Sequence, residues 1–265
     1  MLPISFFHFQ KLKKQHLEPG IRVLITSLVQ KLEKHKDEGW FFDVGANVGL
    51  YVWEVAKVCP TRKILAFEPD PANFELLEMT RKEADILNLE LCPDALSNQT
   101  DEVSFSQDPL TSATGCISGK DKPWIEQYLN GSTNQITVNT RTMDSAADDN
   151  KIPSLIKIDV EGHEAFVLRS ARKIIIKDRP AIVIEVIDKL LKKYGKSSAI
   201  ELYNYFNELD YFIYSIEKNK ITKVESATKD FNLTWTNWLA IPVEKAQISK
   251  SINRSILASL LNPFL

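Results

Sequence analysis

The sequence predicts a doubly wound α/β fold built around a mostly parallel sheet. Two observations carry this prediction. Between residues 40 and 190, short apolar runs alternate with segments of helical periodicity, and a glycine-containing turn joins the first run to the first helix. Strands that alternate with helices are joined by right-handed crossovers, which place helices on both faces of a parallel sheet.

The predicted elements follow in a regular order. Short apolar runs bounded by turn residues are predicted as buried strands over 40–44, 63–68, 89–93, 154–160 and 181–187. Segments with helical spacing are predicted as crossover helices over 50–58, 72–84 and 164–177. A helix over 200–209 and strands over 211–216 and 238–243 complete the order. The polar stretch between these last two strands favours an antiparallel edge hairpin.

Other segments lie outside this alternation. Residues 1–38 are predicted as an N-terminal helical extension, residues 39–245 as the α/β domain, and residues 246–265 as a C-terminal amphipathic helix. Strand-like runs at 103–105 and 136–140 flank the Ser/Thr/Gly-rich stretch 108–120, which has no apolar period. We interpret 108–120 as a flexible loop that closes over a ligand.

Composition narrows the classes of function. Of 265 residues, 44% are hydrophobic and 26% are charged, the balance of a soluble globular protein. The net charge of −2 and the pI near 6.1 argue against non-specific nucleic-acid binding, which depends on a surplus of Lys and Arg. No run approaches the roughly 20 apolar residues of a membrane span. Cys59, Cys92 and Cys116 lack disulfide or zinc spacing. We therefore expect a cytoplasmic protein without a nucleic-acid partner, and a homodimer is compatible with the sequence.

The glycine-containing turn predicts a ligand site. Residues 43–49 read Asp-Val-Gly-Ala-Asn-Val-Gly and lead into the first helix, whose first N–H groups are free to bind a ligand. Glu68 ends the second strand and can accept hydrogen bonds from both hydroxyls of a ribose. Ligands of open α/β sheets bind outside the carboxyl ends of the strands, where both features lie.

Two cofactor classes fit such a turn. Nicotinamide and flavin dinucleotides need a pyrophosphate cradle, usually Gly-x-Gly-x-x-Gly. Here a carboxylate, Asp43, leads the turn. It would repel a pyrophosphate but suits the ammonium group of a methionine moiety, so electrostatics favours S-adenosylmethionine.

A second motif lies at the same predicted edge. Residues 157–164 read Lys-Ile-Asp-Val-Glu-Gly-His-Glu, so that a strand ends in several titratable groups around one glycine. One interpretation is structural, with Asp159 or Glu161 capping the helix that follows. The other is that the group acts on the substrate beside the cofactor.

With these motifs in view, the chain resembles the FkbM family of methyltransferases. The matching segments are 43–49, 67–70 (Phe-Glu-Pro-Asp), 94–97 (Asp-Ala-Leu-Ser), 142–144 (Thr-Met-Asp) and 157–164, together with Glu185. The resemblance covers roughly residues 40–190. It implies a seven-stranded Rossmann-like methyltransferase sheet, S-adenosylmethionine as donor, and a hydroxyl acceptor on a sugar, lipid or natural product.

The resemblance also implies roles for individual residues. Asp43, Gly45, Asn47 and Gly49 would hold the methionine end of the cofactor, and Glu68 the ribose. Asp94, Ala95 and Leu96 would lie beside the adenine, and Asp159 near the transferred methyl group.

Transfer to a neutral hydroxyl also requires removal of its proton. The candidate bases are His163, Asp159 and Glu161, and histidine has the ordinary pKa best suited to neutral pH. A divalent cation is a second route, because Asp159 and Glu185 end adjacent strands and offer oxygen ligands for Mg²⁺ or Mn²⁺. Two alternatives to a methyltransferase stay open: a nicotinamide-dependent oxidoreductase and a catalytically silent nucleoside-binding module.

Overall fold

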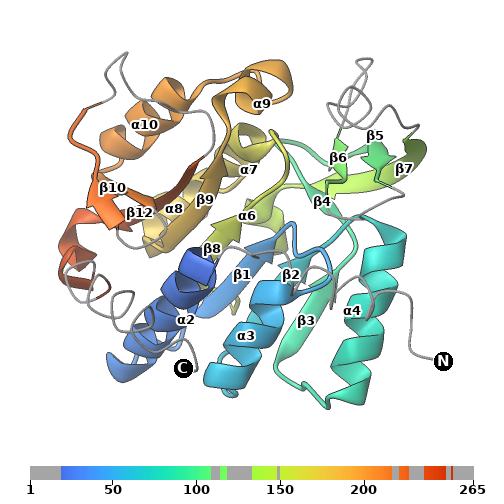
Figure 1. Cartoon of the computed structure of the whole chain (residues 1–265), viewed down its shortest axis with the longest axis horizontal. Helices are drawn as coiled ribbons and strands as arrows, with labels where there is room; N and C mark the ends of the chain where they lie inside the picture. The colour runs from blue at the N-terminus through green and yellow to red at the C-terminus, as the bar shows by residue number, and fades with distance from the viewer. Residues whose placement is uncertain are drawn as a thin grey trace.

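Two β-sheets organise the protein (Figure 1). The computed structural model describes residues 19–108, 114–117, 133–147, 150–216, 221–226, 236–248 and 252. Its large sheet has the order β11-β10-β12-β9-β8-β1-β2-β3, and its small sheet has the order β4-β7-β5-β6. Strands β3, β2, β1, β8 and β9 are parallel, whereas β12, β10 and β11 pair in antiparallel fashion. The predicted doubly wound sheet with an antiparallel edge is confirmed, but the large sheet has eight strands in the described residues instead of the predicted seven, because β11 adds a further edge strand.

The strands of the large sheet are β1 (Trp40–Val44), β2 (Ile64–Phe67), β3 (Leu89–Cys92), β8 (Pro153–Ile158), β9 (Ala181–Val186), β10 (Tyr211–Ile216), β11 (Ile221–Lys223) and β12 (Thr236–Pro242). Those of the small sheet are β4 (Ala95–Leu96), β5 (Asp101–Gln107), β6 (Cys116–Ile117) and β7 (Asn134–Arg141). The helices are α2 (Pro19–Lys34), α3 (Leu50–Val58), α4 (Pro71–Glu83), α6 (Met143–Ala146), α7 (Glu164–Ser170), α8 (Arg172–Asp178), α9 (Asp188–Lys193) and α10 (Ala199–Glu208), followed by the 3₁₀ turn η1 (Val243–Lys245).

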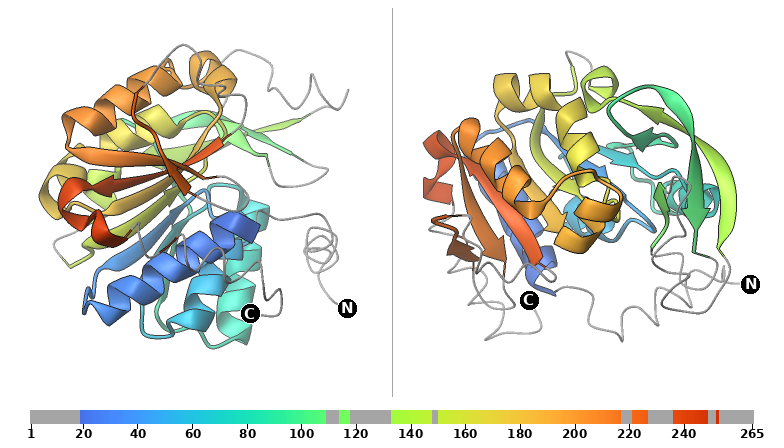
Figure 2. Two further views of the ribbon diagram at one scale, coloured as in Figure 1. Left: turned by 60° about the vertical axis from the view of Figure 1, so that its left-hand side comes forward. Right: turned by 90° about the horizontal axis from the view of Figure 1, so that it is seen from above.

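Helices cover both faces of the large sheet (Figure 2). Alternate side chains of β1 supply two cores: Phe42 packs with residues of α7, α8 and α10, and Phe41 packs with residues of α2 and α3. Within α2, the apolar side chains from Ile21 to Leu32 that face the sheet are at most 5% exposed. Helix α2 is therefore an integral layer of the core, although the sequence marks it only as an extension.

The predicted helix over 164–177 is two helices. Helix α7 ends at Ser170 and α8 begins at Arg172, with Ala171 as the joint between them. The Ser170 hydroxyl donates to the Val167 carbonyl at 2.7 Å and accepts from the Met143 amide at 3.1 Å. A serine that bonds back to its own helix competes with the helical ladder and favours such a break. Helices α6 and α9 and the strands β4 and β11 were also absent from the prediction.

Parts of the predicted loop and of the C-terminal helix are described. Within 108–120, Cys116 and Ile117 form β6 and pair with β5, so a purely irregular loop was wrong for this part. Ile248 and Ile252 are buried in the same core as α2, whereas the rest of the predicted helix beyond Ile252 lies outside the described residues. No helix in the described part of the chain is long and apolar enough to cross a membrane. Cys59, Cys92 and Cys116 are buried free thiols.

Candidate functional site

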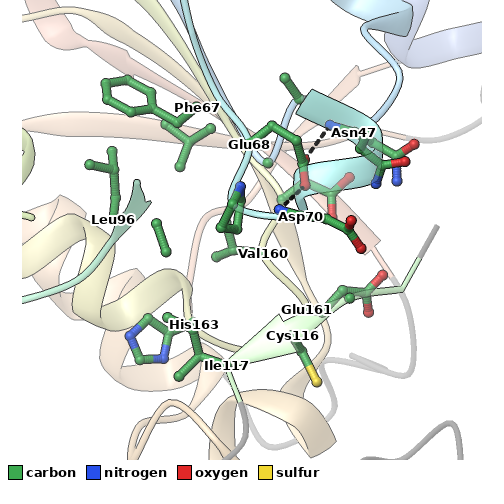
Figure 3. Close-up of a pocket in the computed structure, with 18 of the residues that line it drawn as sticks. Asn47, Phe67, Glu68, Asp70, Leu96, Cys116, Ile117, Val160, Glu161 and His163 are labelled. Carbon is green, nitrogen blue, oxygen red and sulfur yellow. Dashed lines mark hydrogen bonds between the residues drawn. The ribbon is translucent and has the colours of Figure 1, made fainter. Parts of the chain in front are cut away.

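A cavity opens at the carboxyl ends of β1, β2 and β8, where the small sheet meets the large one (Figure 3). Strands of both sheets contribute, because β4 follows β3 directly and carries the chain from the large sheet into the small one. From the predicted site, the cavity is lined by Gly45, Asn47, Glu68, Ala95, Leu96, Asp159, Glu161 and His163. Most of the residues predicted for the site therefore line one cavity.

The turn after β1 depends on left-handed backbone conformations. Gly45, Asn47 and Gly49 have φ values of 77°, 51° and 85°. A Cβ at Gly45 would lie 2.0 Å from the carbonyl oxygen of Asp159, so only glycine lets this turn approach the neighbouring loop. Gly49 packs against Leu77 and precedes α3 rather than lining the cavity. Residues 45–48 of this turn line the cavity.

Glu68 directly follows β2 and lines the cavity. Its Oε2 accepts from the Asn47 amide at 2.7 Å, and its Oε1 accepts from the Asp70 amide at 2.9 Å (Figure 3). Burial raises the pKa of the Glu68 carboxyl to about 7, against the opposing effect of these two hydrogen bonds and of a third from the Asn73 side chain. A carboxylate offers about four acceptor positions, so the held side chain can still accept a hydrogen bond from a ribose hydroxyl.

Asp43 is paired with a lysine beneath the turn. Register places Asp43 of β1 opposite Lys157 of β8, and the Lys157 Nζ lies 3.4 Å from an oxygen of Asp43 and 3.4 Å from an oxygen of Asp159. The same ammonium donates to the Gly45 carbonyl at 2.9 Å and lies over the Tyr51 ring. Burial raises the pKa of Asp43 to about 6, and Lys157 opposes the rise. Asp43 is fully buried, so its contact with the methionine end of a cofactor stays a prediction.

Three carboxylates converge where β8 and β9 end. One oxygen each from Asp159, Glu161 and Glu185 lies within 4.8 Å of the others. Asp159 and Glu161 line the cavity and are partly exposed, whereas Glu185 is 7% exposed. The predicted proximity of Asp159 and Glu185 is therefore present in the structure, and such oxygens are suitable ligands for a hard divalent cation.

His163 is a buried, neutral side chain. It is 8% exposed, its Nε2 lies 2.9 Å from the Ser97 hydroxyl, and its ring stacks on Phe166. Burial, with a smaller contribution from the nearby Arg169, lowers the pKa of His163 to about 4. The histidine is therefore neutral at pH 7 and a weaker base than an ordinary histidine, which makes it a poorer candidate for proton removal than the sequence indicates.

Several residues of the site were not singled out from the sequence. Lys157 and Ser97 stand inside recognised motifs, but their partners depend on strand register and on the path of β4. Cys116 reaches the cavity from the small sheet, whose position no sequence signal gives. In contrast, Asp94 pairs with Arg141 at 3.8 Å, while its neighbour Ala95 lines the cavity.

The fold and the site together define a doubly wound α/β protein with a ligand cavity at the carboxyl ends of its parallel strands. A buried carboxylate after β2, a glycine-containing turn after β1 and apolar walls such as Leu96 and Phe67 are features expected of a nucleoside site at the strand ends. The polar groups at Asp159 and Glu161 suit a second, reacting substrate beside it. A doubly wound sheet whose edge includes an antiparallel β12 inserted between β9 and β10 completes this architecture.

Comparison with known proteins names the family. The model of the FkbM methyltransferase domain matches residues 43–213, and the chain belongs to this family of S-adenosylmethionine-dependent methyltransferases.

Two curated relatives are methyltransferases. Hexuronic acid methyltransferase AglP of Haloferax volcanii is 26% identical over 185 residues, which cover 65% of this chain and 70% of that protein. Methyltransferase 1 of Beauveria bassiana is 23% identical over 145 residues, which cover 50% of this chain and 58% of that protein.

A solved structure shares the fold. The crystal structure of Methyltransferase FkbM from Methylobacillus flagellatus KT aligns with a TM-score of 0.50 at 20% identity. The alignment covers 77% of this chain and 44% of that longer chain.

Proposed function

We propose that this protein is an O-methyltransferase that transfers the methyl group of S-adenosylmethionine to a hydroxyl of a sugar, lipid or natural product. The observation that carries the proposal is one cavity lined by both Glu68 and Asp159. Figure 3 shows Glu161 and His163 across this cavity from Glu68. Donor and acceptor held in one shared space can be aligned for direct transfer.

The donor side fits the cofactor chemically. Glu68 would accept from the ribose hydroxyls, the turn from Gly45 to Gly49 would hold the methionine end, and Leu96 offers an apolar surface to the adenine beside Ala95. When bound, S-adenosylmethionine supplies an electrophilic methyl group. The chain itself binds and orients both substrates and manages the acceptor proton.

The acceptor side supports a hydroxyl. Asp159 lines the cavity and can accept a hydrogen bond from the hydroxyl and then its proton. Lys157, 3.4 Å from Asp159, holds this carboxylate in place. The name of the Haloferax volcanii relative, a hexuronic acid methyltransferase, supports a sugar as the acceptor.

A bound divalent cation is the second route to proton removal. Asp159, Glu161 and Glu185 would hold Mg²⁺ or Mn²⁺ through one oxygen each. The cation would draw the acceptor hydroxyl close and acidify it. Dependence of turnover on added cation separates this route from removal by Asp159 alone.

The proposal is tested by binding and by turnover. Isothermal titration should show binding of S-adenosylhomocysteine and no binding of NAD. Labelled S-adenosylmethionine, offered with a panel of neutral sugars, uronic acids, lipids and phenols, should label at least one acceptor at oxygen. Binding of NAD alone would revive the oxidoreductase alternative. Binding of S-adenosylhomocysteine without transfer to any member of the panel would favour the silent nucleoside-binding module.

A further inference from the structure

The turn between β8 and α7 has an unusual backbone. Glu161 and Gly162 have φ values of 54° and 102°, both in the left-handed region. A Cβ added at Gly162 would also press on Leu190, at a distance of 3.0 Å. Because Asp159, Val160 and Glu161 line the cavity, the conformation of this turn decides where the proposed acceptor-side groups point.

The first half of the turn is fixed by the sheet. The Asp159 amide donates to the Val44 carbonyl at 3.1 Å, and the Asp159 carbonyl lies against Gly45. Past this point the chain leaves the sheet. The amides of Val160 and Gly162 turn inward to a side chain instead of to a neighbouring strand.

That side chain is Glu164, the first residue of α7. One oxygen, Oε1, accepts from the Val160 amide at 3.2 Å and from the Gly162 amide at 3.1 Å. His163 stands at the N-cap of α7, but within the described part of the chain its side chain makes no capping hydrogen bond. Glu164 therefore satisfies, from inside the helix, the backbone donors that the turn leaves without a sheet partner.

Burial makes this arrangement costly for folding. Glu164 is 2% exposed, and its second oxygen, Oε2, is buried without a hydrogen-bond partner among the described residues. A buried carboxylate with an unsatisfied oxygen disfavours folding, whereas an apolar side chain of similar size would avoid that cost. The hydrogen bonds from the amides of Val160 and Gly162 to the Glu164 carboxylate partly offset this cost.

We propose that Glu164 is a positioning residue, whose carboxylate fixes the Val160–Gly162 backbone and thereby aims Asp159 and Glu161 into the cavity. An effect of Glu164 on catalysis rests on the proposed function, because Glu164 would influence Asp159 and Glu161 only through the backbone of the turn. The hydrogen bonds can be tested separately from any reaction.

The test is hydrogen–deuterium exchange of the peptide spanning 156–166, with S-adenosylhomocysteine present. In Glu164→Leu, loss of two hydrogen bonds should speed exchange in this peptide by about tenfold or more. Glu164→Gln keeps an acceptor oxygen of the same reach and should exchange like the wild type. The matched control is Glu201→Leu, an exposed glutamate in the first turn of α10, which should leave the peptide unchanged.

A turnover measurement tests whether the conformation of this turn affects catalysis. With an accepted hydroxyl compound, Glu164→Leu should lower kcat by at least about tenfold while the Kd of S-adenosylhomocysteine stays within about threefold, and Glu164→Gln should restore kcat. A role in folding alone would not separate kcat from donor affinity in this way.

Other results would overturn the proposal. Wild-type exchange of the turn in Glu164→Leu would show that these hydrogen bonds do not hold it, and faster exchange spread evenly over the whole protein would indicate folding alone. If Glu164→Leu does not fold, Glu164→Asp keeps the charge but is too short to reach both amides, and the same peptide must then exchange faster. Absence of turnover in the wild type would count against the proposed function and leave the exchange result standing.

Discussion

Glu68 makes donor binding sensitive to pH. Its carboxyl has a pKa raised to about 7 because it is buried, so near neutral pH only part of the donor-free protein carries the ionised form. Ribose hydroxyls donate hydrogen bonds, and they bind an ionised acceptor more strongly than a protonated one. Binding should therefore favour the ionised form, and donor affinity should rise as pH rises through 7.

The magnitude follows from the fraction ionised. With a pKa of about 7, about one tenth of the protein is ionised at pH 6 and about nine tenths at pH 8, so the apparent Kd should be roughly tenfold weaker at pH 6. If the ribose assignment holds, replacing Glu68 by alanine removes a charge-assisted hydrogen bond to the ribose. At about 1.5–3 kcal/mol for such a bond, its loss should weaken binding by about 10- to 150-fold.

Isothermal titration with S-adenosylhomocysteine at pH 6, 7 and 8 is the assay. Glu68→Gln should flatten the pH dependence, although its amide nitrogen would face a backbone donor, either that of Asn47 or that of Asp70. The control is Glu75→Gln, a position on α4 outside the cavity, which should behave as the wild type. Equal affinities at pH 6 and pH 8 in the wild type, or an unchanged affinity in a folded Glu68→Ala protein, would refute the ribose assignment.

Further predictions concern the acceptor side, stability and the C-terminal segment. Asp159→Asn should lower turnover by about 10²–10⁴-fold, the range for loss of general-base help, with little change in donor affinity; wild-type turnover in this variant would reduce Asp159 to a structural role. If the cation route operates, EDTA should abolish turnover and Mg²⁺ should restore it, whereas insensitivity to EDTA would favour a protein base. Burial raises the pKa of Glu164 to about 7 from 4.5, so the folded state holds this proton more tightly and the free energy of unfolding should fall as pH rises from 4.5 to 7. Urea denaturation of Glu164→Gln should show a shallower fall, and an identical slope would contradict the burial argument. Deletion of residues 246–265 should lower the Tm by about 5 °C or more, because it removes buried Ile248 and Ile252; an unchanged Tm with lost binding to liposomes would favour a membrane-surface role instead.

The sequence predicts the fold where the chain is regular. Apolar runs such as 40–44 and 181–187 mark parallel strands because both of their faces are buried. The break at Ala171 was missed, since it depends on the hydrogen bonds of the Ser170 hydroxyl to residues of two different helices. The strand β6 was missed for a similar reason, because its pairing with β5 is set by contacts within the small sheet.

In the candidate site, too, features set by local sequence could be predicted, whereas features set by packing could not. Gly45 and Glu68 could be placed from the sequence, because turn chemistry and the end of a strand are local properties. The basicity of His163 could not, because its pKa depends on burial beside Ser97 and Phe166. Sequence indicates which titratable groups reach the edge of the sheet, and packing decides which of them carries a charge there.

Lys157 shows most clearly that packing, here the register of two strands, decides which charged groups meet. The sequence contains Asp43, Lys157 and Asp159, but only the parallel register of β1 and β8 sets the lysine between the two carboxylates. Its ammonium also donates to the Gly45 carbonyl in the donor turn. One buried cation therefore contacts the turn that would hold the cofactor and the carboxylate that would meet the acceptor. Because Lys157 is only 5% exposed, a change in charge at either end should alter the electrostatic field at the other with little screening by solvent.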